Sequence, residues 1–94
     1  MIDSRLGFEI NNTIELFETV LHISGSNGTI TVDNDGNYIQ WAEKPIWNQP
    51  TKKWALFYEN NYGCYIFLHE NMEDYEIESI VSELTRRLGD PIPC

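Results

Sequence analysis

Basic residues are scarce in this sequence. Its 94 residues include six Lys and Arg against fifteen Asp and Glu, a formal net charge of −9. A surface that binds DNA, RNA or an anionic membrane needs Lys and Arg opposite the phosphates. The charge balance therefore predicts no direct binding to nucleic acid or membrane and favours a basic protein as the partner. Acidity that serves solubility alone is the alternative interpretation.

Cysteine and long apolar segments are scarce as well. Two cysteines are too few for a disulfide framework, and we expect a buried thiol at Cys64 and a dangling one at Cys94. No apolar run reaches the length of a membrane span, and the N-terminal residues lack the basic and apolar regions of an ordinary signal peptide. The sequence thus predicts a cytoplasmic protein.

Signatures of catalysis and cofactor binding are missing. There is no glycine-rich phosphate loop and no nucleophile elbow. His22 follows Glu18 by one helical turn, where a solvated pair is more common than a general base, and Cys64 has no basic neighbour in sequence to activate it. We predict no catalytic residue, no cofactor and no enzymatic activity.

Metal binding is also not expected. The segment Asp33–Asn37 is superficially like a calcium loop, but the first and twelfth loop positions would be Thr31 and Ala42 instead of acids. His69 and two nearby glutamates have no further His or Cys close in sequence to complete a zinc site. We predict no metal ligands.

The apolar content of 41% and the aromatic content of 13% indicate one folded domain over residues 1–94. Its centre is the stretch Trp54–His69, in which two apolar runs, Trp54–Tyr58 and Tyr62–Leu68, are separated by Glu59–Asn61. Asparagines tolerate the positive φ of a tight turn, so we predict a hairpin. The second run is apolar at nearly every position and predicts a strand covered on both faces, at the centre of a sheet.

The rest of the chain predicts three further strands and two helices. The strands are Arg5–Ile10, Thr29–Asp33 and Tyr38–Glu43, the last two joined by a hairpin turn at Asn34–Gly36. The first helix starts at Asn12 or Thr13 and ends near Ser24, with Ile14, Leu16, Phe17, Val20, Leu21 and Ile23 on its apolar half. The second is capped by Asn71 with Asp74, carries an apolar stripe from Ile77 to Leu88, and stops at Gly89 and Pro91.

This order, β-α-β-β-β-β-α, predicts an α+β fold. Both helices have an apolar face that must be covered, and one face of a single sheet can cover both. We expect a four- or five-stranded antiparallel sheet with two helices packed on one face.

Five carboxylates fall within nine residues of the strand–helix junction, with no base among them: Glu70, Glu73, Asp74, Glu76 and Glu78. Acids near a helix N-terminus complement the helix dipole, which is a purely structural interpretation. The functional interpretation is that these carboxylates take the place of nucleic-acid phosphates in a Lys/Arg-lined groove. Both interpretations expect solvated side chains.

Trp47 is a second candidate contact. It lies between Pro45 and Pro50, and because proline cannot donate to a strand ladder, this segment predicts a loop between strands. The tryptophan either covers the open face of the sheet or anchors an interface.

We hypothesise a non-enzymatic acidic inhibitor that binds a basic nucleic-acid-processing protein and blocks its substrate groove, with Trp47 and the five carboxylates as contacts. In size, acidity and lack of catalytic residues the chain resembles the inhibitors that phages make against bacterial nucleases and CRISPR effectors, and equally the immunity proteins or antitoxins that neutralise a cognate toxin. The likeness implies a nuclease or CRISPR effector as the partner. A small acidic secretion-type chaperone, which would dimerise, is a further alternative.

Overall fold

A computed structural model describes residues 6–10, 12–24, 27–33, 35–60 and 63–93. In chain order the elements are β1 (Leu6–Phe8), α1 (Thr13–Ser24), β2 (Gly28–Val32), β3 (Tyr38–Glu43), β4 (Lys53–Glu59), β5 (Cys64–Glu70), α2 (Asp74–Leu88) and β6 (Ile92–Pro93). The predicted positions Arg5, Asn34, Asn61, Tyr62 and Cys94 lie outside the described residues.

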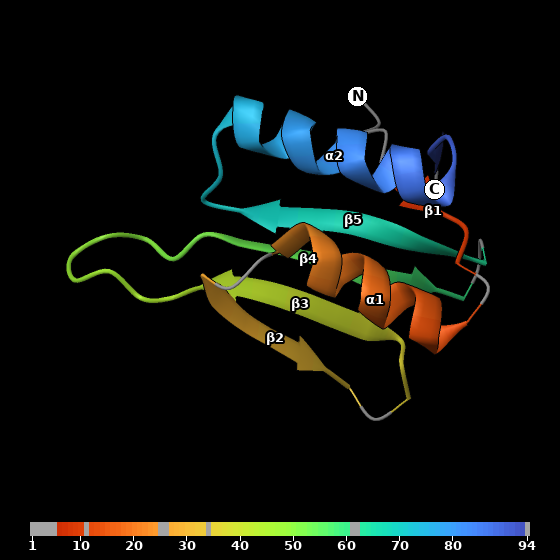
Figure 1. Cartoon of the computed structure of the whole chain (residues 1–94), viewed down its shortest axis with the longest axis horizontal. Helices are drawn as coiled ribbons and strands as arrows, with labels where there is room; N and C mark the ends of the chain where they lie inside the picture. Colours follow the sequence, from red (N-terminus) through yellow and green to blue (C-terminus); the bar gives the residue numbers. More distant parts are fainter. Residues whose placement is uncertain (1–5, 11, 25–26, 34, 61–62, 94) are drawn as a thin grey trace.

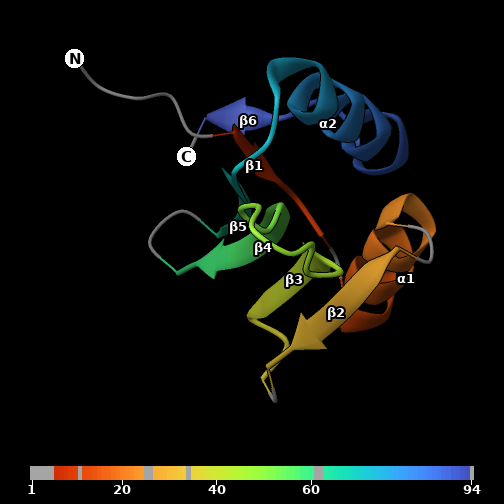
Figure 2. The ribbon, with the colours of Figure 1, turned by 90° about the vertical axis from the view of Figure 1, so that its left-hand side faces the viewer.

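The α+β class and the predicted order of the first seven elements are confirmed. The strands form one antiparallel sheet in the order β2-β3-β4-β5-β1-β6. The expected strands are β1 to β5, and the two-residue β6 adds a sixth that the sequence did not reveal. Both helices cover the same face of the sheet (Figures 1 and 2).

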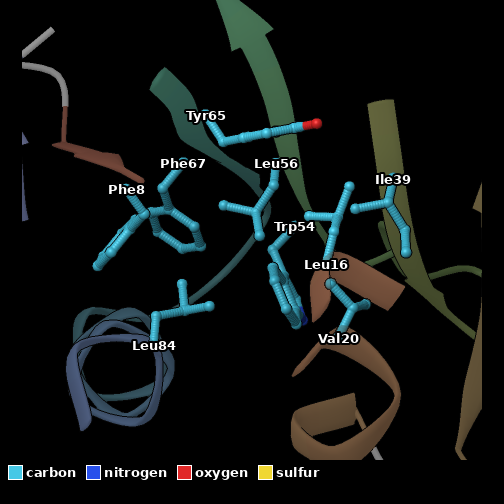
Figure 3. Packing of buried hydrophobic residues seen from close by; sticks show 9 residues of the cluster. All are labelled: Phe8, Leu16, Val20, Ile39, Trp54, Leu56, Tyr65, Phe67 and Leu84. Carbon is cyan, nitrogen blue, oxygen red and sulfur yellow. The ribbon is translucent and has the colours of Figure 1, made fainter. Parts of the chain in front are cut away.

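The core lies between that face and the helices. Antiparallel register places Ile39 opposite Leu56, and Leu56 opposite Phe67, so these three side chains share one face. The buried cluster comprises Phe8, Leu16, Val20, Ile39, Trp54, Leu56, Tyr65, Phe67 and Leu84. Trp54 extends from β4 into the space between the two helices (Figure 3). Burial of this row against α1 and α2 supplies the main driving force for folding.

β4 and β5 are the central strands of the sheet, as predicted. β5 is buried at four consecutive positions, Cys64 to Phe67, and becomes exposed from Leu68 onward. The prediction of a strand covered on both faces therefore holds for its first half.

The apolar half of α1 is only partly covered. Leu16 and Val20 are buried against the sheet, whereas Ile14, Phe17 and Leu21 are 43% to 69% exposed. Only the stripe with Leu16 and Val20 faces the core, because the sheet lies on one side of the helix only (Figure 2). Asn12 caps this helix, since its side-chain oxygen accepts a hydrogen bond from Glu15 N–H at 2.8 Å.

The predicted cap of α2 at Asn71 is wrong. Asn71 has a positive φ of 60°, and its side-chain amide donates to Thr51 O at 2.9 Å. The N-cap is Glu73, whose backbone N–H donates to the Glu76 carboxylate at 3.1 Å. The capping box is therefore formed two residues later than expected.

Cys64 is fully buried, as predicted, but it is disulfide-bonded and not a thiol. The prediction of a thiol rested on the position of Cys64 in the central strand and on Cys94 being the last residue. The sequence did not indicate β6, which pairs with β1 (Figure 2). Disulfides persist mainly in oxidising compartments, so the cysteines lend no support to the predicted cytoplasmic location. No helix in the described part of the chain is long and apolar enough to cross a membrane.

Gly28 begins β2 directly against the Trp41 indole. A Cβ atom at this position would lie 2.3 Å from Ala42 O and 2.4 Å from Trp41 Nε1, far inside van der Waals contact. Because one of these atoms belongs to the backbone of the paired strand, a side-chain rotation alone cannot relieve the clash.

Replacing Gly28 by alanine should therefore destabilise the protein. We expect the free energy of unfolding, measured by urea denaturation, to fall by about 1–3 kcal/mol in Gly28→Ala. Thr31→Ala, at an exposed position of the same strand, is the control and should change it by no more than about 0.5 kcal/mol. Equal losses in the two variants would contradict the close packing of β2 on Trp41.

Candidate protein-binding surface

The β3–β4 loop, residues 44–52, projects from one end of the sheet (Figure 1). It turns at its tip, where Asn48 has a φ of 63° and Gln49 N–H donates to Ile46 O at 3.1 Å. Trp47 is 91% exposed at this tip. It does not cover the sheet, which removes the structural interpretation of this residue.

The base of the loop is tied to the start of α2. Lys52 Nζ lies 3.0 Å from each carboxylate oxygen of Glu76. The Asn71 side chain holds Thr51 O at 2.9 Å, so two contacts join the loop to the segment that leads into α2. Loop and helix start consequently lie at the same end of the molecule (Figure 1).

Four of the five predicted carboxylates are exposed there. Glu73, Asp74 and Glu78 lie along the first turns of α2, and Glu70 ends β5 opposite Lys53 of β4. Together with Trp47 they make up the Trp47 end, as we call this surface. The structure thus places the two sequence-predicted candidates at the same end of the molecule, which sequence spacing alone did not indicate.

Glu76 differs from its neighbours. Only 21% of its side chain is exposed, because Lys52 and the Glu73 N–H occupy its carboxylate. The prediction that this carboxylate is solvated is wrong. The base that pairs with it comes from 24 residues earlier in the chain, so a window of local sequence did not contain it.

The contact shifts the pKa values of both partners. The hydrogen bond from Lys52 holds the pKa of Glu76 below its usual 4.5, with a further contribution from the Glu73 N–H. The pKa of Lys52 is raised above 10.5 by the same hydrogen bond, which outweighs desolvation. Since the folded state lowers the pKa of Glu76, the contact stabilises the fold above the pKa of the unfolded chain and is lost as pH falls through the lowered value.

Carboxylates also lie at the opposite end. Asp33 and Asp35 belong to the β2–β3 turn, and Glu59 ends β4 at the far side from the loop (Figure 1). Negative charge is therefore present at both ends of the molecule. All three lysines, at positions 44, 52 and 53, lie in or beside the β3–β4 loop. The Trp47 end is distinguished by an exposed tryptophan at the same end as exposed carboxylates, and not by charge alone.

A cavity of about 260 Å³ opens between α1 and α2 at the same end. Its walls are Ile23, Ser24, Trp41, Trp54, Met72, Tyr75, Glu76, Ser79 and Ile80. Ser24 Oγ and Trp41 Nε1 are buried in this region without a hydrogen-bond partner among the protein atoms described. One feature of the sequence relates to this cavity. When β3 pairs with β4, Trp41 lies opposite Trp54, so both side chains point to the face covered by the helices and line the cavity.

Nothing in the described segments has the composition of a metal centre: no group of three or more His, Cys, Asp or Glu is placed to hold an ion. His22 and His69, the two histidines weighed from sequence, belong to α1 and β5. Comparisons with family models, with curated proteins and with solved structures give no match for this chain.

The Lys52–Glu76 contact can be tested by carboxyl titration. In Lys52→Met the pKa of Glu76, followed by NMR, should rise toward 4.5 without fully reaching it, because the Glu73 N–H still donates. The free energy of unfolding should accordingly decline less between pH 6 and pH 3 in the variant than in the wild type. Glu83, whose pKa is lowered by Arg86, is the internal control and should titrate unchanged. Identical titration of Glu76 in both proteins would mean that Lys52 does not hold it in solution.

Proposed function

We propose that this chain is a non-enzymatic inhibitor that binds a basic nucleic-acid-processing protein through the Trp47 end and blocks its substrate groove. The observation that carries the proposal is the 91% exposure of Trp47 on a loop that lies at the same end of the molecule as the acidic start of α2 (Figure 1). A tryptophan in this position is costly to hydrate and serves no packing role in the monomer. Tryptophan is also the residue type most enriched among binding hot spots.

The loop presents this side chain in a defined place. Its base is fixed by Lys52 on Glu76 and by Asn71 on Thr51, and its tip is closed by the turn at Ile46 to Gln49. Less conformational entropy is lost on binding when an anchor is held this way, which favours affinity.

The exposed carboxylates supply the second requirement. Glu70, Glu73, Asp74 and Glu78 are exposed at the same end as the anchor, and the whole chain carries a net charge of −9. The net charge attracts a basic protein from any direction and raises the association rate, while the carboxylates near Trp47 face the bases that otherwise hold nucleic-acid phosphates. Phage inhibitors of nucleases or CRISPR effectors belong to this class of acidic inhibitors. An immunity protein would use the same surface against one cognate toxin.

A secretion-type chaperone is a second candidate, favoured by one observation. Ile14, Phe17 and Leu21 form an exposed apolar face on α1, of the kind that a dimer or an unfolded client covers. Light scattering after size exclusion separates the two functions, since the inhibitor is expected to be a monomer and the chaperone a dimer.

Charge reversal tests the inhibitor directly. The triple variant Glu73→Lys, Asp74→Lys, Glu78→Lys spares Glu76 and should keep the fold, because all three side chains are exposed. Loss of a basic protein that the wild type retains from host lysate, identified by mass spectrometry, is the expected result.

The matched control changes net charge by the same amount elsewhere. Glu9, Glu18 and Asp35 are exposed and lie outside the Trp47 end, so their replacement by lysine should slow association without abolishing retention. Equal losses from both triple variants would show that only net charge matters, and the proposed surface would be wrong.

Trp47→Ala tests the anchor. It should weaken binding of the retained protein by about 2 kcal/mol or more, roughly thirtyfold, with no change in the free energy of unfolding. The purified partner should lose its activity on DNA or RNA when the wild-type chain is added, and keep it when the Trp47→Ala variant is added at the same concentration. A partner that is not a nucleic-acid-processing protein, or that stays active in the wild-type complex, would refute the proposed function.

A further inference from the structure

The cavity between α1 and α2 is lined by residues that are not part of the Trp47 end. We infer that it receives one arginine side chain of the basic partner; this inference rests on the proposed function and names the group that the partner contributes. The chemistry of the cavity walls and the position of the cavity favour arginine.

The walls combine aromatic faces with one carboxylate. Trp41, Trp54 and Tyr75 line the cavity, and Glu76 is the only charged residue among the described ones that do so. A guanidinium stacks on aromatic faces and is attracted by their π electrons, most strongly by tryptophan. Its five N–H donors need acceptors, and two lining residues carry side-chain oxygens: Glu76 of α2 and Ser24 at the end of α1.

The size of the cavity fits a side chain. At about 260 Å³ it is smaller than the roughly 300 to 1,000 Å³ of sites for small-molecule ligands. A long, thin side chain with a planar head can enter such a space, and its methylenes would pack on Met72 and Ile80.

Glu76 already holds a cation in the unbound protein. Lys52 Nζ contacts both of its oxygens, and one third of the lysine side chain is exposed. An arriving guanidinium can share or displace this ammonium because it forms a bidentate pair with a carboxylate, which lysine cannot. Lys52 therefore competes with the incoming arginine for the Glu76 carboxylate, in addition to joining the β3–β4 loop to α2.

The cavity is continuous with the Trp47 end. Tyr75, which is 71% exposed at its rim, follows Asp74 directly, and Glu76 joins the wall of the cavity to the loop through Lys52. A partner seated on Trp47 and on the carboxylates of α2 therefore brings its basic side chains to this opening.

The three indole N–H groups provide the readout. We expect N-acetyl-arginine amide, at millimolar concentration, to shift the NMR signals of Trp41 and Trp54 and to leave that of Trp47 in place. The uncharged isostere N-acetyl-citrulline amide and the apolar N-acetyl-leucine amide should shift them at least fivefold less. Equal shifts with citrulline or leucine would overturn the assignment to arginine, and a shift of Trp47 alone would overturn the assignment to the cavity.

Two variants that break the same ion pair separate binding from folding. Glu76→Gln should weaken binding of the arginine amide at least fivefold, whereas Lys52→Met removes the competing ammonium and should strengthen it. Similar weakening in both variants would mean that the ion pair acts only through the fold, which would overturn the inference.

Binding of the arginine amide to the cavity can be measured without the protein partner, so the two proposals can fail separately. Binding of the arginine amide without any retained basic protein would refute the proposed function and leave the cavity assignment standing. Retention of a basic protein that depends on Trp47, with no binding of the amide, would refute the cavity assignment alone.

Discussion

The register of β4 between β3 and β5 is the constraint on which the rest of the structure depends. It directs Trp54 and Leu56 toward the helices, and a shift by one residue would turn both to the open face. The same register fixes where β4 starts, so that the preceding residue, Lys52, reaches Glu76 on α2. The core, the cavity between the helices and the tie at the base of the loop therefore follow from one pairing.

Charge and shape contribute differently to the proposed binding. Carboxylates occur at both ends of the molecule, so charge alone does not select one end for the proposed partner. In the proposed complex, Trp47 on its fixed loop and the opening between α1 and α2 select the binding end. A negative protein that only needed solubility would have no reason to expose its largest side chain at a loop tip.

Strong local patterns made most of the fold predictable. The bounds of β3 and the capped start of α1 follow from alternation and from the Asn12 cap. The features that the sequence did not predict depend on contacts between distant residues. Asn71 hydrogen-bonds to Thr51 instead of capping α2, and Lys52 pairs with Glu76. Cys64 is disulfide-bonded, and β6 pairs with β1. Trp47 and the carboxylates were recognisable one by one, but their common location required the fold.

The most direct measurement is amide hydrogen exchange of this chain, free and in the presence of the basic protein proposed as its partner. We predict added protection in residues 44–52 and over the first turns of α2, with unchanged exchange in the β2–β3 turn. Protection concentrated on α1 or on the open face of the sheet, with the loop unaffected, would contradict it.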